Sequence, residues 1–231
     1  MQRAGLPSDI SQLTTRGLTA DERIALASRI VEAFSGTAAT GIDESELLDA
    51  EARIGMVLPR SLRAAHRQIL TSPGMNSQDR FIPAASLRAD DGFLIFRVEN
   101  QGCAYWAVRA DDCSDDPHVW ISTMGDTWQP DNGPLSSFIV DSALSESIFT
   151  AEHCNNGSID PDQVPPLRAH YSELDVEPFT FWPEPLSHRV FFGGVDTLIA
   201  VDADTWLWVA CRSEEALARA TGIVPTDWLM G

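Results

Sequence analysis

The chain has 231 residues, 44% of them hydrophobic, with seven tryptophans and ten phenylalanines, a composition that predicts a packed core and excludes a disordered protein. Its formal net charge of −18 at pH 7 argues against direct binding to nucleic acid, because phosphate groups are bound by basic surfaces. The sequence contains no run of about 18 apolar residues, so no membrane-spanning segment is expected. Residues 1–18 lack the pattern of a secretory signal peptide, and we therefore expect a cytoplasmic protein.

The first residues of the chain are expected to differ from the rest in their order. Residues 1–18 are polar and rich in turn-forming residues, so they are expected to form a flexible N-terminal segment. Residues 19–231 are expected to form a single domain, in which the Asn-, Asp- and Pro-rich residues 153–178 are a loop-like insertion.

Helices are predicted next. The first begins at a capping box formed by Thr19 and Glu22, and apolar residues then recur at helical spacing. The second begins near Asp43 and ends at Gly55, because glycine readily takes the left-handed conformation that ends a helix. The third begins at Pro59, whose missing amide costs nothing in the first turn.

Residues 93–109 are predicted to form the central hairpin of the protein. Two apolar, β-prone runs flank the segment from Asn100 to Gly102, which is typical of a type I turn followed by a glycine bulge. If Glu99 lies opposite Cys103, alternation along the strands defines two faces. The apolar face comprises Leu94, Phe96, Val98, Ala104, Trp106 and Val108. The mixed face, which we expect to meet water or a partner, comprises Ile95, Arg97, Glu99, Tyr105 and Arg109.

The remaining elements complete the predicted fold. They are a strand over residues 118–123, a helix over 135–149, strands over 190–192, 197–201 and 206–211, and a terminal helix over 213–220. One apolar and one mixed face in the hairpin favour a sheet covered by helices on one side. The predicted fold class is therefore α+β, with a mainly antiparallel meander sheet and helices packed on one face.

The segment from Glu51 to Pro59 carries a resemblance to a known family. Its sequence, Glu51-Ala-Arg-Ile-Gly55-Met-Val-Leu58-Pro59, resembles the E-x-x-x-G-x-x-L-P signature of the SUKH superfamily. In that motif Gly55 would let a helix turn, Leu58 would enter the core and Pro59 would begin the next helix. The likeness extends from about residue 43 to the C-terminus and is best over residues 46–145.

The hairpin adds to this resemblance through Asn100, Gly102 and Trp106, which lie in segments similar to those of bacterial members of the superfamily. The SUKH superfamily includes fungal cell-wall assembly regulators and bacterial immunity proteins that neutralise toxins. The resemblance implies an α+β fold and binding rather than catalysis.

Six aspartates gather near the open end of the predicted hairpin. Continuing the pairing beyond Phe93 places Asp91 opposite Asp111 and Asp90 opposite Asp112. Like charges placed opposite each other destabilise a sheet by roughly 0.2–1 kcal/mol per pair. The cluster is therefore either a site for a basic surface or a cation, or a frayed end whose carboxylates are solvated. This acidic rim comprises Asp90, Asp91, Asp111, Asp112, Asp115 and Asp116.

No pattern in the sequence predicts a catalytic centre, a metal or a cofactor. The acidic rim lacks the glycine and the terminal glutamate of a calcium loop. The four cysteines are isolated, which indicates free thiols rather than a metal site or disulfides. Glu152, His153 and Cys154 are adjacent in sequence, but catalytic triads are assembled across a fold and not from neighbours.

These observations leave three hypotheses. The favoured one is a non-enzymatic immunity protein (antitoxin) that binds a basic toxin, such as a nuclease, through the acidic rim with Arg97, Glu99 and Tyr105. The second is a regulatory or scaffolding module of the cell-wall assembly regulator type with no toxin partner. The third is a small-molecule-binding protein or a hydrolase, which requires a deep pocket holding a paired base and nucleophile.

Overall fold

The computed structural model describes residues 5–123, 127–183, 186–203, 205–224 and 226–229. These residues form two antiparallel sheets and six α-helices, which confirms the predicted α+β class with helices packed on an antiparallel sheet. No helix among the described residues combines the length and the apolar character needed to cross a membrane.

The first sheet is built from residues 80–134 and has the strand order β1-β3-β4-β5-β6, with β2 also paired to β3. Its strands are β1 (Arg80–Phe81), β2 (Arg88–Asp90), β3 (Phe93–Val98), β4 (Ala104–Arg109), β5 (His118–Thr123) and β6 (Gln129–Pro134).

The second sheet is built from residues 153–211 and has the order β7-β12-β11-β10-β8, with β9 also paired to β10. Its strands are β7 (His153–Ser158), β8 (Ser172–Glu173), β9 (Thr180–Pro183), β10 (Leu186–Gly194), β11 (Thr197–Asp202) and β12 (Trp206–Cys211).

The helices lie between and around the sheets. The α-helices are α1 (Ala20–Ser35), α2 (Glu44–Ile54), α3 (Arg60–Gln68), α4 (Leu135–Thr150), α5 (Val164–His170) and α6 (Glu214–Ile223). Short 3₁₀ helices are η1 (Pro73–Met75), η2 (Ala84–Ser86) and η3 (Pro161–Gln163).

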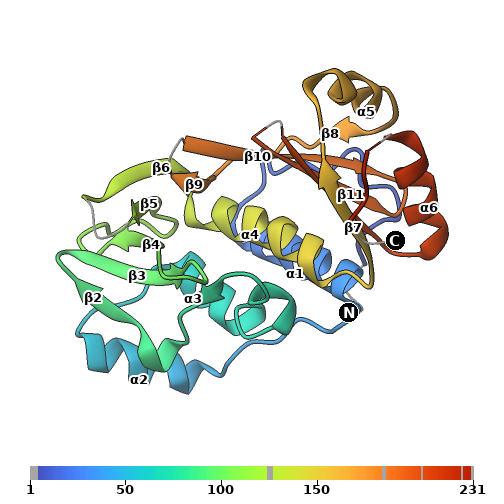
Figure 1. The fold of residues 1–231 in the computed structure, drawn as a ribbon. Helices are drawn as coiled ribbons and strands as arrows, with labels where there is room; N and C mark the ends of the chain where they lie inside the picture. The colour runs from blue at the N-terminus through green and yellow to red at the C-terminus, as the bar shows by residue number, and fades with distance from the viewer. Residues whose placement is uncertain (1–4, 124–126, 184–185, 204, 225, 230–231) are drawn as a thin grey trace.

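Helix α4 lies between the two sheets, with α1 packed along it (Figure 1). It contacts β5 and β6 of the first sheet and β11 and β12 of the second. Every residue from Leu135 to Ile148 is buried. A helix buried on all sides needs small or apolar residues around its whole circumference and partners for its polar groups. Its alternation of large apolar side chains with serine and alanine meets the first need.

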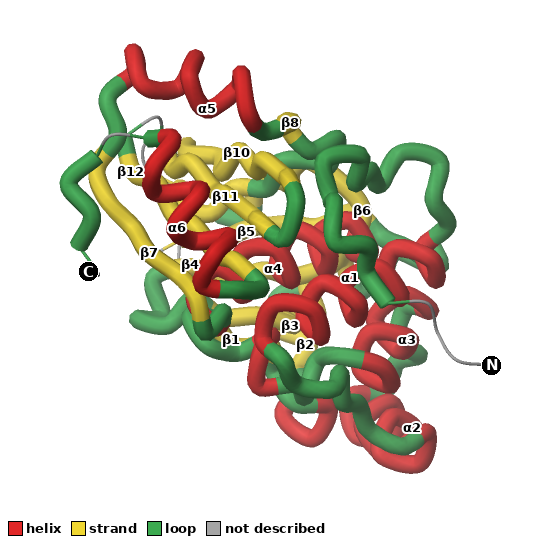
Figure 2. Tube along the Cα trace, turned by 90° about the vertical axis from the view of Figure 1, so that its right-hand side faces the viewer, coloured by secondary structure: helices red, strands yellow, loops and turns green. Residues whose placement is uncertain are grey.

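The second sheet is covered on both faces. Along β11, Leu198 and Ala200 belong to the main core around α4, whereas Ile199 and Val201 belong to a smaller core beneath α6. Figure 2 shows α6 lying over this sheet. Because successive side chains of a strand point to opposite faces, a strand that is apolar throughout can serve two cores.

The central hairpin contains a β-bulge that its sequence did not indicate. Leu94 pairs with Val108 as predicted, but the register shifts by one residue at Phe96, so that Arg97 pairs with Trp106. The predicted pairing of Phe96 with Trp106 is therefore wrong, because the extra residue is left without a partner in the ladder. Gly102 has the predicted left-handed conformation, with a φ of 75°, and its amide donates to the carbonyl oxygen of Glu99. The Glu99 amide donates to the carbonyl oxygen of Ala104, so the predicted position of Glu99 opposite Cys103 is wrong.

Two segments differ from their predicted character. The loop-like insertion predicted over residues 153–178 begins with β7, which pairs along its whole length with β12. This strand was missed because it is rich in asparagine and contains Gly157, where a Cβ atom would lie 2.9 Å from the carbonyl oxygen of Asp227. The described part of the N-terminal segment, residues 5–18, lies against the second sheet, where the Ile10 amide donates to Gly194.

The motif that resembles the SUKH signature connects α2 to α3. Gly55 ends α2 with a φ of 73°, and Leu58 is 2% exposed in the core. The Glu51 carboxylate accepts a hydrogen bond from the Leu58 amide at 2.8 Å and pairs with Arg63 on α3. Pro59 immediately precedes α3. Each motif residue therefore lies where a tight connection between two consecutive helices requires it.

The contact between the N-terminal segment and the second sheet can be tested at Gly193. A Cβ atom there would lie 2.7 Å from both the Ile10 carbonyl oxygen and a methyl carbon of Leu174. We expect Gly193→Ala to lower the free energy of unfolding by roughly 1–3 kcal/mol, measured by urea denaturation.

The matched control is Gly222→Ala in α6, where nothing lies within 4 Å of the added Cβ atom. That substitution is expected to raise the free energy of unfolding by about 0.5–1 kcal/mol, because alanine is a better helix former than glycine. Equal effects of the two substitutions would show that the segment does not pack on Gly193.

Candidate functional site

The face of the first sheet that points away from α4 carries an aromatic surface. Ile95 and Ala107 are buried on this face. They belong neither to the main core around α4 nor to the smaller core beneath α6. A hollow of about 700 Å³ lies over it, and the described residues that line it belong to strands, turns and loops. We define the aromatic surface as Phe93, Tyr105, Arg109, Trp120 and Trp128.

The side chains of the aromatic surface hold each other in place. The ring of Phe93 stacks on Trp128 with centroids 4.7 Å apart and meets the edge of Trp120 at 5.5 Å. The guanidinium of Arg109 lies over the rings of Phe93 and Trp120 at 5.8 and 5.9 Å. Stacked aromatic rings and a cation above them form a preorganised surface that is partly open to water.

The acidic rim does not have the pairing that the sequence predicted. Asp91 and Gly92 form a two-residue turn with φ values of 47° and 80°, so the chain reverses there and Asp90 pairs with Phe93. The prediction that Asp90 and Asp91 lie opposite Asp112 and Asp111 is therefore wrong. The Asp-Gly dipeptide, which is typical of a tight hairpin turn, was the pattern that would have revealed strand β2.

The other members of the acidic rim have different surroundings. Asp111 is exposed and accepts two hydrogen bonds of 2.8 Å from Arg109, which lower the pKa of its carboxyl group. Asp112 accepts from the Ser114 amide, and Asp115 is exposed. Asp116 instead accepts from the amide and hydroxyl of Ser136 at 2.9 and 2.6 Å, so it caps the first turn of α4.

Two residues of the predicted mixed face lie inside the protein. Arg97 is 3% exposed and Glu99 is 8% exposed, so neither is on the open surface with Tyr105. The bulge at Phe96 explains the change, because it turns both Phe96 and Arg97 toward α4. Phe96 meets Phe138 of α4 at 5.5 Å, and Arg97 pairs with an acid of the same helix.

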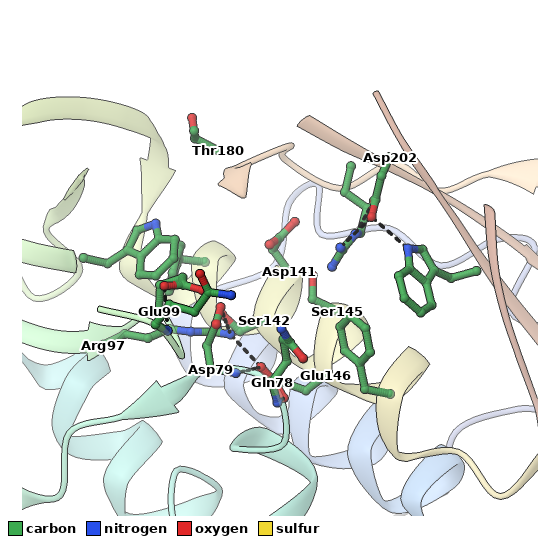
Figure 3. A pocket seen from close by; sticks show the side chains of 16 residues that line it. Gln78, Asp79, Arg97, Glu99, Asp141, Ser142, Ser145, Glu146, Thr180 and Asp202 are labelled. Atoms are coloured by element: carbon green, nitrogen blue, oxygen red, sulfur yellow. Dashed lines mark hydrogen bonds and ion pairs between the residues drawn. The ribbon is translucent and has the colours of Figure 1, made fainter. Parts of the chain in front are cut away.

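Arg97 and Glu99 line a polar cleft between the two sheets (Figure 3). The cleft has a volume of about 320 Å³, and α4 forms its floor. The first sheet, the loop before β1 and the second sheet supply its walls. The sequence does not reveal this cleft, because its residues come from four separate parts of the chain. Its charged residues are Asp79, Arg97, Glu99, Asp141, Glu146, Arg189 and Asp202.

One wall of the cleft is held by a buried ion pair. The Arg97 guanidinium donates to Oε1 of Glu146 at 2.8 Å and to Asp79 at 3.3 Å. The Glu146 carboxylate also accepts from the backbone amides of residues 77–79, at 2.8, 2.8 and 3.1 Å. This acid therefore ties α4 to β3 and to the loop before β1.

A second buried pair holds the opposite wall. The Nε and Nη2 atoms of Arg189 donate to the two carboxylate oxygens of Asp202 at 2.5 and 2.9 Å. Asp202 also accepts from the indole N–H of Trp208 at 2.8 Å. Two parallel bonds give this pair a defined geometry as well as electrostatic attraction.

Asp141 lies on α4 between these two pairs (Figure 3). Its side chain is buried, and its Oδ1 atom has no hydrogen-bond partner among the described residues. Burial raises the pKa of this carboxyl group to about 7, although the charges of Arg189 and Arg97 act in the opposite direction. The neighbouring Asp131 has a raised pKa for the same reason.

The cleft does not assemble the groups of a familiar catalytic centre. The hydroxyl of Ser142 lines it but has no hydrogen-bond partner in the described part of the chain, so no base is in place to activate it. Within the described ranges, no three His, Cys, Asp or Glu side chains are arranged to hold a metal ion. The four cysteines are free and separate.

Comparisons of the chain with protein-family models, with curated proteins and with solved structures gave no match. The resemblance to the SUKH superfamily therefore stays a prediction from the motif at residues 51–59.

The buried pair on α4 can be compared with an exposed pair. Glu146→Ala would leave the Arg97 guanidinium without its main buried counter-ion, and we expect the free energy of unfolding to fall by roughly 3–5 kcal/mol. Asp175→Ala removes a partner of Arg16 at a pair whose side chains are 82% and 51% exposed, and we expect a much smaller loss there because water screens the exposed charges. Urea denaturation measures both, and equal losses would contradict the role assigned to Glu146.

The raised pKa of Asp141 predicts a pH-dependent stability. Between about pH 4 and pH 7 the unfolded chain ionises this carboxyl group while the folded protein keeps the proton, so folding loses stability as the pH rises. The free energy of unfolding of Asp141→Asn, minus that of the wild type, should therefore increase by on the order of 4 kcal/mol from pH 4 to pH 8. Denaturant titrations across this range test it, and a difference independent of pH would contradict it.

Proposed function

We propose that the protein is a non-enzymatic binding protein that recognises a basic protein partner through the aromatic surface, and that it acts as an immunity protein against a toxin. The observation that carries this proposal is the preorganised aromatic surface on a sheet face whose hollow is lined, among the described residues, by strand, turn and loop residues alone. Aromatic and arginine side chains are the residues that contribute most to protein–protein binding energy, and here they form one patch.

The charge around the aromatic surface supports a basic partner. Asp90, Asp91 and Asp111 are exposed beside it, in a chain whose formal net charge is −18. Carboxylates at the rim of an interface attract an oppositely charged protein over several ångströms and speed its association. A nuclease, whose substrate-binding surface must be basic, is a partner of this kind.

The composition of the rim also suits specificity. Arg109 is held by Asp111 and lies over two aromatic rings, so it presents its remaining donors in a defined direction. A partner must therefore match both the apolar rings and a polar group, which disfavours proteins that are merely basic. The motif at residues 51–59 adds the resemblance to a superfamily that contains immunity proteins.

The proposal is tested at Trp120. Trp120→Ala removes the ring that meets both Phe93 and Arg109, and we expect affinity for the partner to fall at least about 30-fold, as for a central interface tryptophan. Leu48→Ala on α2, whose side chain is 54% exposed and does not line the hollow over the aromatic surface, should leave affinity unchanged. Surface plasmon resonance measures both, and raising the salt should slow association of the wild type.

The immunity function is tested by expressing the protein in a host cell together with any toxin that a neighbouring gene encodes. The wild type and Leu48→Ala are expected to protect the host cell, and Trp120→Ala is expected to lose protection. Survival no better with any of the three proteins than with the toxin alone would contradict an immunity function. A captured partner without toxic activity would instead favour the regulatory or scaffolding hypothesis.

A further inference from the structure

The cleft between the sheets contains polar atoms that the fold leaves without partners. Asp141 and Ser142 are 8% and 1% exposed, and both line the cleft. The Oδ1 atom of Asp141 and the hydroxyl of Ser142 have no hydrogen-bond partner among the described residues. Buried polar atoms are nearly always bonded, so this oxygen and this hydroxyl are the atoms of the cleft that can form new bonds to a group entering it.

The two arginines of the cleft are already engaged, which argues against an anionic ligand. Arg97 bonds to Glu146 and Asp79, and Arg189 forms two parallel bonds with Asp202. An anion would have to displace these buried carboxylates from their guanidinium groups, which would leave the displaced charges uncompensated.

The balance of charge in the cleft favours a cation. Five carboxylate side chains and two guanidinium groups line it, so ionised Asp141 adds to an excess of negative charge. In Figure 3, Asp141 lies between the group around Arg97 and the pair around Asp202. Asp131 lies close enough to add further negative potential.

The unpartnered oxygen atoms of Asp141 and Ser142 favour a cation that carries N–H donors. A guanidinium or ammonium group supplies several N–H donors, which match the acceptors on Asp141 and Ser142. The indole N–H of Trp106 also lacks a partner in the described part of the chain and lines the same cleft, so it can donate to a carbonyl oxygen on the ligand. A volume of about 320 Å³ is at the small end of ligand pockets.

We propose that the cleft binds a guanidinium or ammonium group, with Asp141 as its counter-ion and the Ser142 hydroxyl as a second acceptor. The group is carried either by a free small amine or by an arginine or lysine side chain of a protein, because the same atoms recognise both. The proposal does not depend on the aromatic surface, which lies on the opposite face of the first sheet.

Binding of a cation is linked to the ionisation of Asp141. Besides the cation, this carboxyl group faces Arg97 from β3, Arg189 from β10, Asp131 from β6 and the acids of the cleft. Its pKa of about 7 means that the ionised fraction falls roughly tenfold from pH 8 to pH 6. The affinity of the cleft for a cation should fall by about the same factor.

The test is isothermal titration calorimetry of the full chain at pH 8 and pH 6 with Nα-acetyl-L-argininamide, called argininamide below, whose only charge is the guanidinium. Nα-acetyl-L-citrullinamide, called citrullinamide below, is the matched neutral ligand, since a urea group replaces the guanidinium at nearly the same shape and the acetyl group removes the charge of the α-amine. We expect argininamide to bind with one-to-one stoichiometry and citrullinamide to bind at least tenfold more weakly. Equal binding of the two amides, or no binding of argininamide, would overturn the proposal.

Two variants test whether argininamide binds in the cleft. Asp141→Asn should weaken argininamide binding at least tenfold and abolish its dependence on pH, whereas Asp162→Asn, which removes an exposed acid near α5, should bind as the wild type does. Undiminished binding of argininamide to folded Asp141→Asn would overturn the proposal. Should that variant not fold, NMR of the wild type must show the pKa of Asp141 falling when argininamide is added, and an unchanged pKa has the same consequence.

The source of the cation is distinguished by a second pair of probes. Agmatine carries the guanidinium on a free amine, and an acetylated, amidated Gly-Arg-Gly peptide carries it within a chain. Tighter binding of agmatine assigns the cleft to a small molecule, and tighter binding of the peptide assigns it to a side chain of a protein. Failure of both to compete with argininamide would count against the proposed site.

Discussion

The bond network of Glu146 is the constraint on which the rest of the structure depends. Helix α4 is buried between two sheets, so any charge on it must be neutralised by the protein itself. Glu146 meets this requirement with the Arg97 guanidinium and the backbone amides of residues 77–79. One side chain thereby joins the central helix, the hairpin of the first sheet and the loop that precedes it.

The β-bulge at Phe96 makes this network possible. In a regular strand Arg97 would point away from α4, because neighbouring side chains alternate between faces. The bulge places Phe96 and Arg97 on the same side, where the ring of Phe96 packs on Phe138 and the guanidinium reaches Glu146. The outer face carries Phe93, Tyr105, Arg109 and Trp120, which with Trp128 form the aromatic surface.

The same pair of strands therefore contributes to two surfaces with opposite properties. Phe93, Tyr105 and Arg109 face the open hollow, which is wide and partly aromatic. Arg97, Glu99 and Trp106 face the cleft between the sheets, which is smaller and rich in carboxylates. The first suits a large partner that covers a surface, and the second suits a single charged group that enters it, so the two proposals call for ligands of different size.

The sequence by itself determined the elements whose causes are local. Gly55, Pro59 and Gly102 predict the turns that the structure contains, and apolar spacing predicts α4, because caps, turns and periodicity act over a few residues. The acidic composition also followed from the chain alone, whereas the mixed face was predicted with Arg97 and Glu99, which the structure places in the cleft. Tertiary structure decided what the sequence left open: the bulge at Phe96, the separation of the strands into two sheets, and the cleft around Asp141. These depend on contacts between residues far apart in the chain, whose burial and pairing exist only once α4 lies between the sheets.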